Sequence, residues 1–218
     1  MLDLCDMQDS SSVPKGKKIA RLPQQERSQS RMEKVLAAAE QLLQEVGPDA
    51  TSIPEIAKLS GVPRASIYQF FPDKYALLAH LASQQMERIA ALIDSSRPGP
   101  EGDWKQAIGR VIRGVAGYYN AHPAASLLLL RGNFTPLDSQ AHERKDAMIG
   151  SLLRDYLLAR GGFDSLPRQP DVTTLAVEIA FACMKYGYLA EGRISETICV
   201  EAEQAAIAYL SRWQSPAA

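Results

Sequence analysis

A short segment between two prolines carries four different hydrogen-bonding side chains. A guanidinium, a hydroxyl, a phenol and an amide occur within six consecutive positions, and each can donate a hydrogen bond. Phosphate oxygens and the edges of base pairs accept such bonds, so this segment has the chemistry of a surface that binds DNA. Arginine can bind guanine and glutamine can bind adenine, which makes Arg64 and Gln69 the candidates for base recognition. The other outward positions are Ala65, Ser66 and Tyr68.

The hydrophobic pattern predicts the helices that must position this segment. Apolar residues from Met32 to Val46 recur at steps of three and four, which places them on one stripe of a helix. Ser30 and Glu33 have the spacing of a capping box at its start, and Gly47, followed by proline, ends it. A long amphipathic helix is therefore expected ahead of the polar segment.

Two short helices follow, joined by a turn that contains glycine. Ser52 and Glu55 form a second capping box, and the helix that they start extends to about residue 59. Gly61 can take the positive φ that ends it, and the polar segment forms the next helix, residues 64–70. The pair is a helix-turn-helix, although an ordinary αα-hairpin with a polar exposed face has the same turn. The apolar positions expected to pack the pair are Ile53, Ile56, Ala57, Val62 and Ile67.

The rest of the chain is also predicted to be helical. Asp73 caps a fourth helix, and glycine and proline then separate five further segments. None of these segments has the alternation of apolar and polar residues that is typical of a strand. We therefore expect an all-α chain of about nine helices. The breaks fall at residues 97–102, 122–123, 132–136, 161–170 and 191–192.

The net charge restricts how the chain can contact DNA. It has 24 basic and 25 acidic residues among 218, a formal charge of −1, which excludes a histone-like polycation and requires local clustering of charge. Residues 1–27 combine serine, proline and lysine and predict a flexible basic arm. This arm either serves solubility or follows the phosphate backbone or a minor groove.

The sequence favours a cytoplasmic protein without membrane contact. No stretch reaches the ~18 apolar residues of a membrane span, and residues 1–8 lack the basic and apolar run of a secretory signal. The three cysteines form no CxxC motif, which favours a reducing compartment over a disulfide scaffold.

Between residues 31 and 74 the chain carries apolar, small and aromatic residues at fixed spacing. They are Val35, Leu36, Ala38, Ala39, Leu42, Leu43, Gly47, Thr51, Ile56, Ala57, Gly61, Val62, Ile67, Tyr68, Phe70, Phe71 and Lys74. This set resembles the DNA-binding domain of the TetR family of bacterial transcription regulators. Two positions depart from the family's pattern: Ala65 stands where glycine is usual, and Pro63 where serine or threonine is common.

The resemblance implies a contact for several single residues. A hydroxyl beside the free amides of a helix start favours an anion, so Thr51 and Ser52 are expected at a phosphate. Tyr68 resembles the family's phosphate-binding tyrosine. Lys74 lies in the first turn of a helix, where a cation opposes the helix dipole, and a neighbouring phosphate would explain its position.

The resemblance also implies two domains, with DNA binding in residues 28–88 and effector binding and dimerisation in residues 89–218. The last two predicted helices are apolar around more than one stripe, which indicates a second buried face. In the family these helices form the dimer interface, and a homodimer suits a near-palindromic operator. The alternative is a helix pair buried inside a monomer. The candidate interface residues are Leu175, Ile179, Tyr186, Ile198, Ala202, Ala205, Ala206 and Tyr209.

The central helices are rich in aromatic and flexible apolar side chains. The resemblance implies an effector pocket among them, and a plain hydrophobic core is the alternative. Phenol and indole groups suit an amphipathic or aromatic ligand. Because acidic residues are sparse among them, we expect a neutral or anionic ligand over a cationic one. The candidate pocket residues are Trp104, Tyr118, Tyr119, Phe134, Met148, Tyr156, Phe181, Met184 and Tyr188.

Other chemistry has little support in the sequence. The three histidines are scattered, and no phosphate loop, nucleophile elbow or zinc-binding helix motif is present. We therefore expect no enzyme activity, no metal and no cofactor. Cys183 and Cys199 fit small buried hydrophobes, with a thiol redox sensor as the alternative.

The expected function is a dimeric transcription repressor that a small apolar or aromatic ligand releases from its operator. An activator or a ligand-independent regulator is an alternative within regulation. An all-helical carrier of an apolar molecule, with a vestigial helix-turn-helix, is an alternative from another class. Binding to operator but not to random DNA separates the regulators from the carrier.

Overall fold

The structure, a computed structural model, describes residues 24–96, 102–131 and 136–215, with side chains from residue 26 and, in the last of these ranges, from residue 146. Most of the predicted arm lies outside these residues. Its last part, residues 24–27, is helical, because glutamine, glutamate and arginine are good helix formers and Glu26 suits a first turn. Ser30 therefore lies inside the first helix rather than at its start.

The described residues are helical almost throughout and contain no strand, as the sequence predicts. No helix among them is both long and apolar enough to cross a bilayer. The helices are α1 (Gln24–Ala50), α2 (Ile53–Ser60), α3 (Arg64–Tyr68), α4 (Lys74–Ser95), α5 (Trp104–Ala121), α6 (Pro123–Ser126), the π-helical turn η1 (Leu127–Arg131), α7 (Pro136–Arg160), α8 (Val172–Glu191) and α9 (Glu196–Ser211).

The predicted caps of the helix-turn-helix are present. Gly47 has a φ of +77°, which interrupts α1 three residues before its end at Ala50. The Ser52 hydroxyl accepts a hydrogen bond from the Glu55 amide at 3.4 Å and so caps α2. Gly61 ends α2 with a φ of +67°, and the Asp73 carboxylate caps α4 by accepting from the Ala76 amide at 2.8 Å. Local sequence therefore sets both ends of α2 and the start of α4, whereas α3 has no side-chain cap and ends at Tyr68, two residues before the predicted end.

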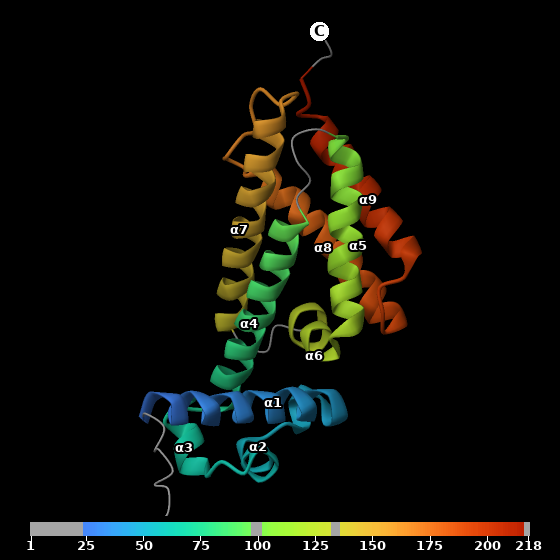
Figure 1. Ribbon diagram of the computed structural model, residues 1–218. Helices are drawn as coiled ribbons and strands as arrows, with labels where there is room; N and C mark the ends of the chain where they lie inside the picture. Colours follow the sequence, from blue (N-terminus) through green and yellow to red (C-terminus); the bar gives the residue numbers. More distant parts are fainter. Residues whose placement is uncertain (1–23, 97–101, 132–135, 216–218) are drawn as a thin grey trace, which may run out of the picture.

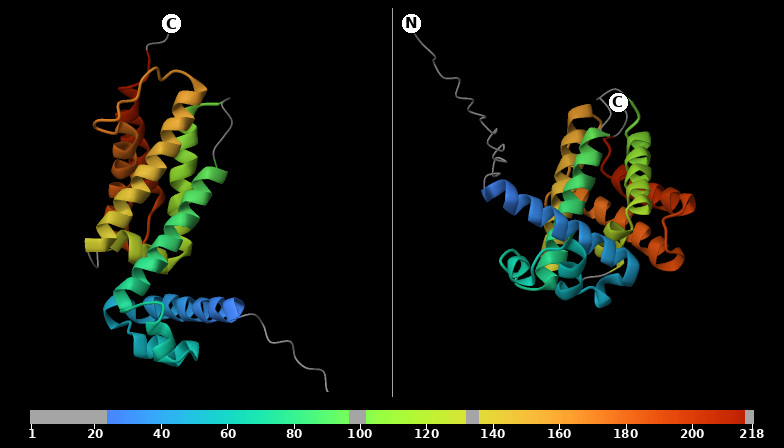
Figure 2. Two further views of the ribbon diagram at one scale, coloured as in Figure 1. Left: turned by 90° about the vertical axis from the view of Figure 1, so that its left-hand side faces the viewer. Right: turned by 60° about the horizontal axis from the view of Figure 1, so that its bottom comes forward.

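The molecule has two parts that share one helix. In Figure 1, α1 lies crosswise beneath a bundle of upright helices, and α2 and α3 lie on the side of α1 that faces away from the bundle. α4 starts beside α1 and rises into the bundle, where it packs with α5 and α7. The turned views of Figure 2 confirm this crosswise placement, with α8 and α9 on the opposite side of the bundle from α4. The position of α3 thus depends on α1 and α4.

Two close helix crossings hold the bundle together. A Cβ added at Gly150 of α7 would lie 2.8 Å from the Cα of Thr174, and one at Gly187 of α8 would lie 2.6 Å from Cγ1 of Ile198. Glycine lets these backbones approach closely, so α7, α8 and α9 pack more tightly than larger residues would permit.

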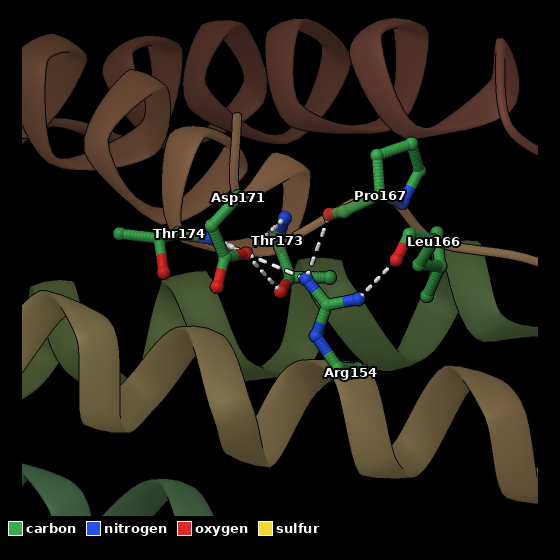
Figure 3. A network of polar contacts seen from close by, with 6 residues as sticks. All are labelled: Arg154, Leu166, Pro167, Asp171, Thr173 and Thr174. Atoms are coloured by element: carbon green, nitrogen blue, oxygen red, sulfur yellow. Dashed lines mark hydrogen bonds and ion pairs between the residues drawn. The ribbon is translucent and has the colours of Figure 1, made fainter. Parts of the chain in front are cut away.

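A buried arginine fixes the connection between α7 and α8. The Arg154 side chain is 2% exposed and donates hydrogen bonds to the carbonyls of Leu166 and Pro167 and to Oδ1 of Asp171, the last at 2.7 Å (Figure 3). The same carboxylate oxygen accepts from the hydroxyl and amide of Thr173 and from the amide that follows, so it also caps α8. One carboxylate therefore ties the loop to both helices.

The environment of Asp171 lowers its pKa. Partial burial alone raises it, but hydrogen bonds from Thr174, Thr173 and Arg154, with the arginine's charge, outweigh burial and bring the pKa from 3.8 to about 2. The ionised form is thus favoured in the folded state.

Acid should remove the stabilisation that this carboxylate provides. Because the folded pKa lies below the unfolded value, the stabilisation is complete above about pH 4 and is lost as the pH falls toward about 2. Urea unfolding of the wild type and Asp171→Asn should differ most in free energy above about pH 5 and converge as the pH falls to about 2 and below. Asp164→Asn, at an exposed position, is the matched control. A difference that stays constant with pH would contradict this assignment.

Candidate functional site

The short helix α3 presents the polar segment to solvent. Ile67 is fully buried and anchors the helix, while Arg64, Ala65 and Gln69 are exposed. Tyr68 is 51% exposed although its ring is large and apolar, and Ser66 is half-buried. Because only Ile67 of α3 is buried, the predicted contact residues on its open face are accessible to a binding partner.

Thr51 does not lie where the sequence predicts. It is fully buried, and its hydroxyl donates a 2.8 Å hydrogen bond to the carbonyl of Gly47. The hydroxyl is therefore used inside the turn after α1, which corrects the expectation that it contacts a phosphate. Ser52 is half-buried and remains at the start of α2, where its hydroxyl also lies 3.1 Å from a Glu55 carboxylate oxygen.

Lys74 has a partner within the protein. Its Nζ donates hydrogen bonds to the carbonyl of Pro48 at 3.3 Å and to that of Asp49 at 3.0 Å, at the end of α1. The predicted conflict with the dipole of α4 is thus offset by the carbonyls at the end of another helix. No phosphate is needed to explain its position, and the lysine joins the end of α1 to the start of α4.

Further basic side chains lie exposed on α1 and α2. Arg27, Arg31 and Lys34 follow at steps of four and three along α1, and Lys58 lies on α2. Sequence reasoning assigned only Arg27 to a role, as part of the arm. The spacing by itself indicates one helix face, so this basic stripe could have been predicted.

A buried polar chain joins α1 to the bundle. Gln85 of α4 is 1% exposed; its amide donates to a carboxylate oxygen of Glu40 on α1 at 2.6 Å, and its carbonyl accepts from the hydroxyl of Tyr118 on α5. Arg88 lies 3.8 Å from the same glutamate oxygen. Burial is the main cause that raises the pKa of Tyr118, which keeps its hydroxyl a donor. Three helices are therefore linked through one glutamine.

A cavity of about 120 Å³ lies in the bundle between α4, α5, α7, α8 and α9. Its walls are almost entirely apolar, with mostly aliphatic side chains and three aromatic rings. An apolar cavity of ~150 Å³ stays dry and holds a molecule the size of benzene. This cavity therefore suits a small or slender apolar molecule.

Four of the predicted pocket residues line the cavity: Tyr119, Tyr156, Phe181 and Met184. Four others do not, and Phe134 lies outside the described residues. These four are Trp104, Tyr118, Met148 and Tyr188.

The four excluded side chains have other surroundings. Trp104 packs edge-on against Phe163, with ring centroids 5.2 Å apart, and Tyr118 bonds to Gln85. Met148 is 44% exposed on α7, and Tyr188 packs half-buried against the core. Residue type alone could not separate these positions from the cavity wall, because the helix rotation decides which way each side chain points.

Sequence reasoning missed Asp146, a carboxylate in the cavity wall. It is 2% exposed, and its negative charge adds to the effect of burial in raising the pKa of Tyr119. The expectation of a neutral or anionic ligand depended on sparse acidic groups, and Asp146 is an acidic group in the wall that the sequence analysis did not count.

The outer face of α8 carries an apolar stripe. Leu175 is 39% exposed, Tyr186 71% and Leu189 56%, and Ile179 between them is half-buried. These positions, with Ala182, follow steps of four and three, the spacing of a helix–helix seam. The stripe is an unpartnered surface on the single chain.

The predicted interface residues of α9 divide into two groups. Ala205 and Tyr209 are half-buried. Ala202 and Ala206 are buried at 0% and 3% exposure, and Ile198 packs into α8 at Gly187. These three contact the chain's own core, which corrects their assignment to a surface between two copies.

The two described cysteines, Cys183 and Cys199, are free thiols. Burial is the first cause that raises the pKa of both, and neighbouring glutamates add to it. A raised pKa lowers the thiolate fraction, so the surroundings favour the interpretation as small hydrophobes over a redox sensor.

Known transcription regulators match parts of this chain in sequence. A family model described as bacterial regulatory proteins, tetR family, matches residues 35–81. The HTH-type transcriptional regulator EthR of Mycolicibacterium smegmatis is 28% identical over 114 residues, 52% of this chain and 51% of that protein. An uncharacterized HTH-type transcriptional regulator of Mycobacterium tuberculosis is 34% identical over 70 residues, 32% of this chain and 36% of that protein. The match thus spans about half of the first relative and a smaller part of the second.

Solved structures are similar over nearly their whole length. A TetR-family transcriptional regulator from Streptomyces coelicolor has a TM-score of 0.67 and 29% identity, covering 85% of this chain and 98% of that one. A complex of SmeT with triclosan has a TM-score of 0.61 at 14% identity, covering 86% and 93%. The fatty acid degradation regulator FadR from Bacillus halodurans has a TM-score of 0.62 at 18% identity, covering 83% and 94%. At such identities the last two share the fold.

Replacing Lys74 should weaken the fold. In Lys74→Met the two carbonyls at the end of α1 lose their charged donor, and we expect the free energy of unfolding to fall by about 1–2 kcal/mol. Urea denaturation measures this change. Lys58→Met, an exposed lysine on α2, is the control and should change stability by less than about 0.5 kcal/mol. If both variants unfold like the wild type, Lys74 has no structural role.

Proposed function

We propose that this chain, which belongs to the TetR family of bacterial regulatory proteins, is a homodimeric repressor that a small ligand releases from its operator. The observation that carries the proposal is the face of α3, where Arg64, Gln69 and Tyr68 are exposed around the buried anchor Ile67. A short helix with donors on its open face fits the major groove. Arg27, Arg31 and Lys34 on α1 add charge for the phosphate backbone.

Dimerisation is supported by the apolar stripe on α8. Leu175, Tyr186 and Leu189 are large apolar side chains that water contacts on the single chain. A second copy related by two-fold symmetry would cover the same stripe on each protomer. Two copies would then place two α3 helices on the half-sites of a near-palindromic operator.

Ligand release is supported by the path of α4. Its first residue, Lys74, bonds to the end of α1, and Ile89 and Ile93 near its other end line the cavity. A ligand that widens the cavity would displace α4 and, through it, α3. For release, the ligand must bind the form that does not bind DNA more tightly, and DNA must weaken ligand binding by the same factor. The triclosan complex of SmeT supports a ligand in this fold.

The same proposal places the protein in the cytoplasm, without catalysis and without a metal or cofactor. An activator would share the DNA face and the cavity and differ only in the effect on transcription. A carrier of apolar molecules would keep the cavity but would not distinguish operator from random DNA. Fluorescence anisotropy with DNA from upstream of the gene, against random DNA of equal length, tests the regulator directly.

Sequence preference should depend on Arg64. We expect Arg64→Ala to change the affinity ranking of operator variants by about 1–3 kcal/mol, because a bidentate contact to a base would be lost. Tyr68→Phe should weaken binding to all variants alike, because a phosphate contact carries no base information. Unchanged ranking with Arg64→Ala would remove this residue from base recognition.

Assembly should depend on Tyr186. A charge in the proposed seam has no partner, so Tyr186→Glu should give monomers with lower operator affinity and unchanged helix content. The side chain is 71% exposed on the single chain, so its replacement leaves the fold intact. Leu158→Glu, at a 43% exposed position on α7, is the control and should remain dimeric. Light scattering measures the mass, and a Tyr186→Glu dimer would place the interface elsewhere.

A further inference from the structure

The first turns of α1 add nothing to the hydrophobic core. From Glu26 to Arg31 no side chain is buried, and Val35 is the first residue of this helix that is. Residue 35 is also where the match to the TetR family begins. Figure 2 shows the start of α1 reaching past the bundle and past α2 and α3. These turns are therefore an extension whose exposed side chains are accessible to a partner.

One face of α1 is acidic and turns toward the bundle. Glu40 lies on this face, because its carboxylate accepts a hydrogen bond from Gln85 of α4 at 2.6 Å. Glu33 and Glu26 precede it by seven and fourteen residues, close to two and four whole turns. At about 100° per residue, both lie within about 40° of Glu40 around the helix. The carboxylates of α1 thus follow one line on the side of the bundle.

The opposite face of the same helix is basic. Arg27, Arg31 and Lys34 lie about 120° to 180° from Glu40 around the helix, and all three are exposed. In Figure 1, the side of α1 that faces away from the bundle is the side on which α2 and α3 lie. The basic side chains therefore project to the same side of the molecule as the open face of α3.

We infer, on the basis of the repressor function above, that these three residues form a second, separate DNA contact. They bind phosphates beside the groove that α3 enters, because the start of α1 reaches past α3 (Figure 2). Arg27 and Lys34 are seven residues apart, a rise of about 10 Å, and one strand of B-DNA carries about three phosphates over that axial length.

The side chains of this contact have charge to spare for a phosphate. None of the three forms an ion pair among the described residues. Arg31 donates from Nε to the carbonyl of Arg27 at 3.2 Å, which orients the guanidinium and uses only one of its nitrogens. The carboxylates of Glu26 and Glu33 lie on the other face, so they do not repel the phosphates that the basic face meets.

The test removes the three charges together and measures DNA binding by anisotropy at several salt concentrations. In Arg27→Gln/Arg31→Gln/Lys34→Gln, the slope of log affinity against log salt should fall by about 3 per bound protomer, because each phosphate contact contributes about 0.9. The affinity ranking of operator variants should not change, because phosphates carry no base information. Each single variant should lower the slope by about 1, which keeps the test valid if the triple variant does not fold.

Two further variants separate a local contact from a general effect of charge. Lys105→Gln/Arg110→Gln/Arg212→Gln removes three exposed charges from the bundle and should leave the slope unchanged. Arg27→Lys/Arg31→Lys keeps both charges and should bind with the wild-type slope. An equal loss of slope in the bundle variant, or no loss in the variant of α1, would overturn the inference.

Hydroxyl-radical footprinting locates the contact on the DNA. The triple variant of α1 should lose protection of backbone positions beside those that α3 protects, while the positions at α3 stay protected. A footprint of unchanged width would overturn the inference.

The same experiments keep this inference distinct from the proposed function. If the wild type binds operator and random duplex alike, the repressor is wrong, and the salt slope on random duplex still tests the contact of α1. If operator is preferred and the slope and footprint do not depend on the basic face of α1, the second contact is wrong while the repressor stands.

Discussion

The arrangement of this protein depends on one continuous helix that belongs to both of its parts. α4 packs Leu77, Leu78 and Leu81 as buried residues near its start and Ile89 and Ile93 against the cavity near its end. A helix keeps its hydrogen bonds along its whole length, so a shift at one end is carried to the other. Buried residues along one face of this helix therefore make the helix-turn-helix part and the cavity mechanically dependent on each other.

Polar contacts at the start and in the middle of α4 determine which movements this helix can transmit. Lys74 bonds to the end of α1, and Gln85 bridges Glu40 of α1 and Tyr118 of α5. A buried amide with both of its ends bonded is costly to separate, because each unpaired group would lose its partner away from water. These contacts hold α1, α4 and α5 in one relative position until something inside the bundle displaces a helix.

The bundle combines tight and loose packing. Close crossings at Gly150 and Gly187 fix α7, α8 and α9, and Arg154 with Asp171 fixes the loop that joins α7 to α8. The cavity lies between these rigid contacts and α4. A ligand that needs more space would therefore move α4 more easily than α8, so the predicted dimer face can remain fixed while α3 moves.

The sequence by itself determined the helices and the helix-turn-helix motif, because caps, glycine turns and hydrophobic spacing act within a few residues. Gly47, Ser52, Gly61 and Asp73 set their boundaries through local hydrogen bonds and backbone conformation. Only the tertiary structure decided the partners of side chains far apart in the chain. Lys74 meets carbonyls 25 and 26 residues away, and small differences in helix rotation bury Ala202 and aim Asp146 into the cavity. The periodicity of one helix specifies which residues share a face, but packing against its neighbours determines what that face contacts.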